Sequence, residues 1–72
     1  MDTRARLIDA TWDQIRGGGV SAATSRAITD AAGANLGAIT YYFGSKDALV
    51  AETLVARIKE LVEDPTTLLL EG

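Results

Sequence analysis

The stretch Gly33-Ala-Asn-Leu-Gly-Ala-Ile-Thr-Tyr-Tyr-Phe-Gly-Ser-Lys46 decides the fold of this chain. Gly33 is expected to turn the backbone in the left-handed conformation, which glycine adopts without a steric penalty. Asn35 is predicted to cap a short helix that Gly44 ends, and Ser45 is predicted to cap the helix that follows. A helix this short does not hold itself together in water. Neighbouring elements must therefore pin it in place.

This short helix, residues 35–43, has two distinct faces when it is projected at the helical repeat. Ile39 and Phe43 share the face expected in the core, whereas Gly37 and Tyr41 point away from it. The pattern leaves the burial of four flanking residues open: Leu36, Ala38, Thr40 and Tyr42. Small residues and tyrosines outside, with a lysine beside them, suit close approach to a large polar surface. The major groove of DNA is the strongest candidate for that surface.

The first helix is predicted over residues 3–16. Five residues recur there at helical spacing: Leu7, Ile8, Thr11, Trp12 and Ile15. Asp2 or Thr3 can cap its start. Gly17-Gly18-Gly19 is expected to stop this helix, because each glycine costs a helix about 1 kcal/mol relative to alanine. Val20 is expected to return to the core as the loop turns.

A second helix is predicted from about residue 24 to residue 32, with Thr24 or Ser21 as its cap. A fourth is predicted over residues 46–62, with Asp47 in its first turn complementing the helix dipole. The fourth helix has a broad apolar stripe: Leu49, Val50, Leu54, Ile58, Leu61 and Val62. Asp64-Pro65 is expected to end or break it, because a residue before proline disfavours the helical region. The residues predicted in the core without a direct functional role are Trp12, Ile15, Ile28, Ile39 and Phe43.

Length and composition exclude several classes of protein. Seventy-two residues, 47% of them apolar, make one small domain with too much apolar content for disorder. The chain has neither cysteine nor histidine, so it lacks disulfides, the usual zinc ligands and the usual general base. No apolar run approaches the roughly 18 residues of a membrane span, and no signal peptide is apparent. We therefore expect a cytoplasmic protein that is not an enzyme and uses no metal or cofactor. DNA binding, if present, would make it nucleoid-associated.

The net charge of −3 opposes nucleic-acid binding, but the charges are unevenly distributed. Residues 1–46 carry five basic and four acidic side chains, whereas residues 47–72 carry two basic and six acidic ones. The acidic excess thus falls outside the part expected at DNA. Because residues 1–46 have only a small excess of positive charge, a single copy is expected to bind DNA weakly.

Residues 24–43 are predicted to form a helix, a tight turn and a second helix, which is the arrangement of a helix-turn-helix module. A set of spaced residues in this region resembles the DNA-binding domain of TetR-type bacterial transcriptional repressors. These residues are Thr24, Ile28, Ala31-Ala32-Gly33, Gly37, Ile39, Tyr42-Phe43, Ser45-Lys46 and Leu49. The resemblance covers roughly residues 4–60, and its most specific part is the segment Tyr41–Leu49. It implies an all-α fold, with a three-helix, homeodomain-like helix-turn-helix bundle and a longer fourth helix.

The resemblance also implies a division of the chain. Residues 1–46 would form the DNA-binding domain and residues 47–63 the connecting fourth helix. Residues 64–72 would lead to an effector-binding and dimerisation domain absent from this sequence. Two copies would then present their third helices to a palindromic operator as a homodimer, and a small-molecule effector would release them.

Roles carried over from the family fall on eleven residues: Thr24, Ser25, Arg26, Asn35, Leu36, Gly37, Ala38, Thr40, Tyr41, Tyr42 and Lys46. Thr24 and Ser25 would meet phosphates at a helix N-terminus, and Thr24 can cap at the same time. Arg26 can reach a guanine edge, or it is a solvated surface charge. Lys46 would grip the DNA backbone.

The third helix has its own implied contacts. Gly37 and Ala38 allow close backbone approach and contact with a thymine methyl group, and Leu36 either adds an apolar contact or packs in the core or at a dimer interface. Thr40 departs from the tyrosine that many relatives carry. Tyr41 and Tyr42 can donate to phosphates, although Tyr42 is expected to pack against the fourth helix more than Tyr41.

Two other functions were weighed against DNA binding. An enzyme is disfavoured because the acidic groups are scattered and no nucleophile–base pair exists. A small helical protein–protein interaction module is the alternative, favoured by the acidic balance and the apolar tail. Salt dependence separates them, since DNA binding weakens steeply with salt and an apolar contact does not.

Overall fold

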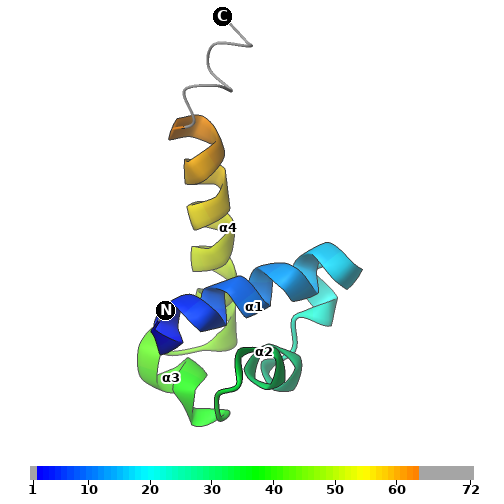
Figure 1. The fold of residues 1–72 in the computed structure, drawn as a ribbon, viewed down its shortest axis with the longest axis vertical. Coiled ribbons are helices and arrows are strands. Elements are labelled where there is room, and N and C mark those ends of the chain that lie inside the picture. The colour runs from blue at the N-terminus through cyan, green and yellow to red at the C-terminus, as the bar shows by residue number, and fades with distance from the viewer. Residues whose placement is uncertain (1, 64–72) are drawn as a thin grey trace, which may run out of the picture.

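The computed structural model describes residues 2–63. The described chain is all-helical, with α1 at Thr3–Gly18, a 3₁₀ turn η1 at Val20–Ala22, α2 at Ser25–Ala32, α3 at Gly37–Phe43 and α4 at Lys46–Glu63. Figure 1 shows α4 standing upright, with α1 crossing its base and with α2 and α3 below α1. This arrangement confirms the predicted all-α class. The predicted break at Asp64-Pro65 and the tail lie outside the described residues.

Side-chain caps fix the start of three helices at residues that the sequence offered for the purpose. Asp2 Oδ1 accepts from the Ala5 amide at 2.8 Å, Thr24 Oγ1 from Ala27 at 3.1 Å and Ser45 Oγ from Ala48 at 3.0 Å. Each bond satisfies an amide that has no partner within its helix. Of the two pairs of capping candidates, the structure therefore selects Asp2 and Thr24.

The end of α1 differs from the prediction. The helix runs through Gly17 and Gly18 and ends at Gly19, whose φ of 84° and ψ of 178° leave the helical region. Two glycines do not cost enough to end a helix that neighbouring elements hold. Gly18 also has a packing role, because a Cβ there would lie 2.9 Å from the Ala22 Cβ in η1. Gly18 therefore lets η1 approach α1, and only Gly19 ends the helix.

Val20 was wrongly predicted to return to the core. It opens the 3₁₀ turn and is 50% exposed, whereas Ala23 is fully buried. The tight turn brings the chain back to α1 three residues later than expected, and the short Ala23 side chain fits there.

The core lies where α1, α2, α3 and the first turns of α4 meet. Its buried apolar residues are Leu7, Ala10, Ala23, Ile28, Ala32, Ile39, Leu49 and Val50. Each fully buried Leu or Ile side chain contributes about 1.5–3 kcal/mol relative to exposure. Ile28 and Ile39 confirm their predicted burial. Ile15 and Phe43 are only partly buried against the core, and Trp12 is half-buried.

Three threonines in this core satisfy their hydroxyls within their own helices. Thr11, Thr29 and Thr53 donate to the carbonyls four residues earlier, at 2.7, 2.9 and 2.8 Å. All three are at most 2% exposed. A hydroxyl that is already bonded to the backbone can face an apolar core without leaving an unpaired polar group.

The apolar stripe of α4 is only partly used. Leu49 and Val50 are buried and Leu54 is half-buried, but farther along the helix the apolar side chains face solvent. These exposed residues are Val55, Ile58, Leu61 and Val62, each about 60% exposed. α4 extends well past the point where α1 crosses its base (Figure 1), so α1 covers only the first part of the stripe.

Candidate nucleic-acid interface

The turn between α2 and α3 sets the direction of α3. Gly33 adopts the predicted left-handed conformation, with φ 68° and ψ 34°. Its amide lies 3.3 Å from the Asp30 carbonyl, and the Ala34 amide donates to the Thr29 carbonyl at 2.9 Å. These bonds close the end of α2 and redirect the chain within a few residues. The helix-turn-helix arrangement predicted for this region is therefore present.

The two faces of α3 are as predicted. Ile39 is 3% exposed, and Phe43 packs partly buried against the core. On the opposite face Gly37 is exposed and Tyr41 is 81% exposed. Gly44 ends α3 with φ 86°, and its amide donates to the Thr40 carbonyl at 3.0 Å. The core thus anchors a short helix whose outer face is free.

Asn35 is not the helix cap that the sequence predicted. The cap position is Leu36, which already has helical dihedrals and makes no side-chain capping bond. The Asn35 backbone carbonyl instead accepts from Ala38 at 3.0 Å, and the Leu36 carbonyl accepts from Ile39 at 3.4 Å. Because these backbone bonds satisfy the first amides of α3, the exposed Asn35 side chain is not needed there.

The structure settles the four positions whose burial the sequence left open. Ala38 is half-buried and Thr40 is exposed, while Leu36 and Tyr42 are 49% and 41% exposed. The Tyr42 ring meets the Tyr41 ring edge to face, with 4.8 Å between centroids. Leu36 is therefore not a core residue, and it lies beside the outer face of α3.

The first turn of α2 brings together three of the residues selected from the sequence. Thr24 is exposed and Ser25 is half-buried, and the Ser25 carbonyl accepts from Thr29 Oγ1. Thr24 Oγ1 accepts its capping bond, so its hydroxyl hydrogen is still available to an outside acceptor. Arg26 is exposed and forms no salt bridge among the described residues.

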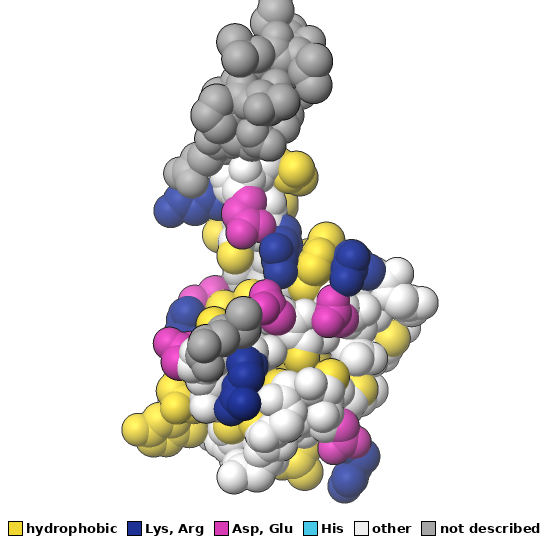
Figure 2. Space-filling view, viewed as in Figure 1, with side chains coloured by type: hydrophobic (Ala, Val, Ile, Leu, Met, Phe, Trp, Pro, Cys, Tyr) yellow, Lys and Arg dark blue, Asp and Glu magenta, His cyan; other side chains and the backbone are white. Residues whose placement is uncertain are grey.

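Basic side chains divide into paired and unpaired groups. Within residues 2–63, the salt bridges use Arg4, Arg16 and Arg57, whereas Arg6, Arg26, Lys46 and Lys59 form none. On the face shown in Figure 2, basic and acidic side chains interleave around the junction of α1 and α4. Arg6, Arg26 and Lys46 lie in the first turns of α1, α2 and α4, and none of the three has a salt-bridge partner among the described side chains.

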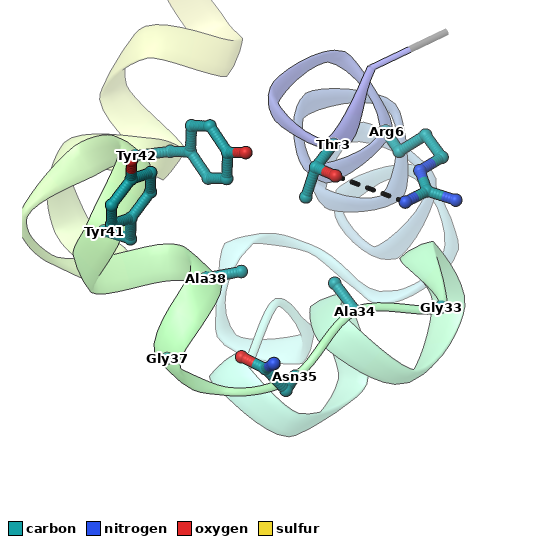
Figure 3. A pocket seen from close by; sticks show the side chains of 9 residues that line it. All are labelled: Thr3, Arg6, Gly33, Ala34, Asn35, Gly37, Ala38, Tyr41 and Tyr42. Carbon is teal, nitrogen blue, oxygen red and sulfur yellow. Dashed lines mark hydrogen bonds between the residues drawn. The ribbon is translucent and has the colours of Figure 1, made fainter.

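A groove separates α3 from the first turn of α1 (Figure 3). Five of the selected residues line it from α3 and the preceding turn, together with Gly33 and Ala34, and α1 contributes the side chains of Thr3 and Arg6. Sequence reasoning missed these two. Their spacing of three puts them on one side of a helix, but only the packing of α1 shows that this side faces α3.

The described residues form neither a metal site nor a membrane-spanning helix. Within residues 2–63, no group of three or more acidic side chains is placed to hold a metal ion. None of the helices described here is both long and apolar enough to cross a membrane.

Comparison with known proteins identifies the family. Residues 7–53 match the family model described as bacterial regulatory proteins, tetR family. The chain belongs to the TetR family. The matched region contains η1, α2 and α3 and most of α1, so the TetR helix-turn-helix is the arrangement described above.

Individual TetR-family relatives give the same picture. The HTH-type transcriptional regulator BetI of Burkholderia thailandensis is 36% identical over 58 residues, covering 81% of this chain and 30% of that protein. The HTH-type transcriptional regulator PksA of Bacillus subtilis is 35% identical over 65 residues, covering 81% of this chain and 32% of that protein. The chain therefore spans about a third of the length of these relatives. No solved structure matches it significantly.

Proposed function

We propose that this chain is the part of a TetR-type transcriptional repressor that binds DNA in a sequence-specific manner, with α3 in the major groove. The observation that carries the proposal is that Ile39 anchors α3 in the core while Gly37 and Tyr41 on its opposite face are exposed. A helix of this kind fits the width of the major groove. The family supports the same assignment.

Two kinds of contact follow from this placement. Thr24, Ser25 and Lys46 bind phosphates on either side of the groove and fix the position of α3, because hydroxyls and a lysine ammonium donate to anions without reading sequence. Tyr41 and Tyr42 add phosphate contacts through their hydroxyls.

Base readout would come from Arg26 and from residues of α3 and its preceding turn. Arg26 is long, charged and without a carboxylate partner among the described residues, so it can donate to both acceptors of a guanine. Gly37 and Ala38 let the backbone of α3 approach, and Ala38 and Leu36 can contact a thymine methyl group. Thr40 and Asn35 are exposed beside them and can bond to a base edge or a phosphate.

The mechanism of regulation extends the proposal to the whole protein. Two copies would bind successive major grooves of a palindromic operator as a homodimer. A small-molecule effector bound in a further domain would change the separation of the two α3 helices and release the DNA through a coupling of about 1–3 kcal/mol. The matched relatives are about three times longer than this chain, which leaves room for such a domain.

A small helical protein–protein interaction module is the alternative function. One observation favours it, namely the exposed apolar residues Val55, Ile58, Leu61 and Val62 along α4. A protein contact made through this surface would not weaken steeply as salt is added.

The test is a selection of random DNA duplexes on the immobilised chain at low ionic strength. DNA binding predicts an enriched sequence motif, and the affinity for it should fall steeply with salt. Enrichment of no motif, together with binding that is insensitive to salt, would contradict the proposal and favour the protein-interaction module.

A further inference from the structure

The groove between α1 and α3 brings a basic side chain to the edge of the proposed DNA-binding face. Thr3 and Arg6 line it from α1, and Gly37, Ala38, Tyr41 and Tyr42 line it from α3 (Figure 3). The same view shows the Tyr42 ring extending toward the first turn of α1. None of the residues that line the groove is acidic. Its polar groups are therefore suited to an anion and not to a metal cation.

Arg6 is available to such an anion because nearby carboxylates already have partners. Arg6 also lines a second, smaller hollow, together with Asp9 and Asp13. Arg57 binds Asp9 at 3.1 Å, and Arg16 binds Asp13 at 2.6 Å. The bond recorded for the Arg6 guanidinium goes instead to a neutral group, Thr3 Oγ1, at 3.3 Å. Among the described residues, the charge of Arg6 is therefore not neutralised by a salt bridge.

We propose that this groove binds a backbone phosphate of the same duplex that α3 enters, with Arg6 as the principal contact. The inference rests on the proposed function and adds α1 to the interface. The Arg6 guanidinium can donate two parallel hydrogen bonds to one phosphate, which suits the planar fork of arginine. The Thr3 hydroxyl lies beside it, and the Tyr42 hydroxyl can donate from the opposite wall.

The small residues on the α3 side explain why a DNA strand can reach Arg6. Gly37 is exposed and Ala38 is half-buried, so no long side chain from the first turn of α3 stands between Arg6 and a duplex. The groove and the outer face of α3 share Gly37 and Tyr41, so both can contact one duplex. A phosphate at Arg6 would hold α1 against the DNA, as Lys46 would hold α4.

The first experiment measures binding of a selected duplex by fluorescence anisotropy across a range of salt concentrations. Arg6→Ala is expected to weaken binding about five- to tenfold and to lower the salt slope by about one unit, without changing the preferred sequence. Arg16→Ala is the matched control, because Arg16 is on the same helix but is paired to Asp13. An Arg6→Ala variant that binds with the wild-type slope overturns the inference.

A second experiment tests the phosphate contact directly. Single phosphates of the duplex are replaced by neutral methylphosphonates, and affinity is measured for wild type, Arg6→Ala and Lys46→Ala. Neutralising one particular phosphate should weaken binding by wild type and by Lys46→Ala but not by Arg6→Ala. Neutralising a different phosphate should weaken binding by wild type and by Arg6→Ala but not by Lys46→Ala. If Lys46→Ala shows such a position and Arg6→Ala shows none, the α1 contact is wrong while the proposed function stands. If wild type binds no duplex, both proposals fail.

Inorganic phosphate in solution is the other ligand that could bind in this groove through the same hydrogen bonds. The Arg6 Nε–H signal in NMR spectra should move on addition of duplex, and it should not move with inorganic phosphate at the same phosphate concentration and ionic strength. An equal response to both would make the groove a simple anion site and would overturn the assignment to DNA. Circular dichroism melting should show that Arg6→Ala remains folded, since Arg6 is exposed and outside the core.

Discussion

Arg57 Nη2 donates to Asp9 Oδ1 at 3.1 Å and joins α4 to α1 across 48 positions of the sequence. The same guanidinium lies 5.5 Å from the centroid of the Trp12 ring and binds Glu60 through its other terminal nitrogen. A second arginine makes a similar connection, because Arg4 pairs with Glu52 and lies 5.0 Å from the Phe43 ring centroid. Arginines on both helices therefore fix α1 against α4.

The first prediction concerns the stability that Arg57 provides. Arg57→Ala should lower the free energy of unfolding by about 1–2 kcal/mol, because it removes a cation–π contact, a partly exposed ion pair and the packing of the side-chain stem. Urea denaturation measures the change. Lys59→Ala is the matched control on the same helix, since Lys59 is exposed and forms no salt bridge within the described residues. Equal losses in the two variants would show that Arg57 has no special role.

The second prediction compares two glycines of opposite backbone geometry. Gly33→Ala should destabilise the domain by about 1 kcal/mol or more, because alanine is strained at φ 68°. Gly17→Ala should stabilise it by up to about 1 kcal/mol, because Gly17 is helical and a Cβ there would meet nothing within 4 Å. Thermal melts of both variants provide the comparison. Melting temperatures that shift in the same direction would contradict this account of the two glycines.

These glycines also show which features of the fold can be predicted from the sequence. Gly33 and Gly44 were predicted correctly because a positive φ is a local property that glycine alone adopts easily. The extent of α1 into Gly17 and Gly18 was not predicted, because it depends on the approach of Ala22 in η1. Local chemistry specifies where the chain turns, while contacts between elements decide how far a helix continues.

The candidate site also combines features that the sequence predicts with features that it does not predict. The two faces of α3 followed from helical periodicity, whereas the sequence offered two hydroxyls, Thr24 and Ser21, as the cap of α2 and the structure shows Thr24 in that role. The error at Asn35 arose because Leu36 already adopts helical dihedrals, which the sequence does not encode in any obvious residue type. Thr3 and Arg6 were missed because they reach the site through the packing of α1 beside α3.

The third prediction tests the anchoring of α3. Ile39→Asn should unfold the domain, because an amide placed at a position 3% exposed would be left without a hydrogen-bond partner and would also remove apolar burial. Leu36→Asn is the matched control at the N-cap position of α3, where the side chain is 49% exposed, and it should change stability by no more than about 0.5 kcal/mol. Circular dichroism distinguishes the two. A folded Ile39→Asn protein would show that α3 is held by something other than this side chain.

The last prediction separates base readout from phosphate binding. Arg26→Ala should weaken binding to the selected duplex by about 1–3 kcal/mol and relax the preference at one base pair, because arginine can bond both acceptors of guanine. Lys46→Ala should weaken binding to all duplexes and lower the salt slope by about one unit. Repeating the duplex selection and the salt titration with each variant measures both effects. A uniform loss for Arg26→Ala would remove Arg26 from base readout, and an unchanged slope for Lys46→Ala would remove Lys46 from the phosphate contacts.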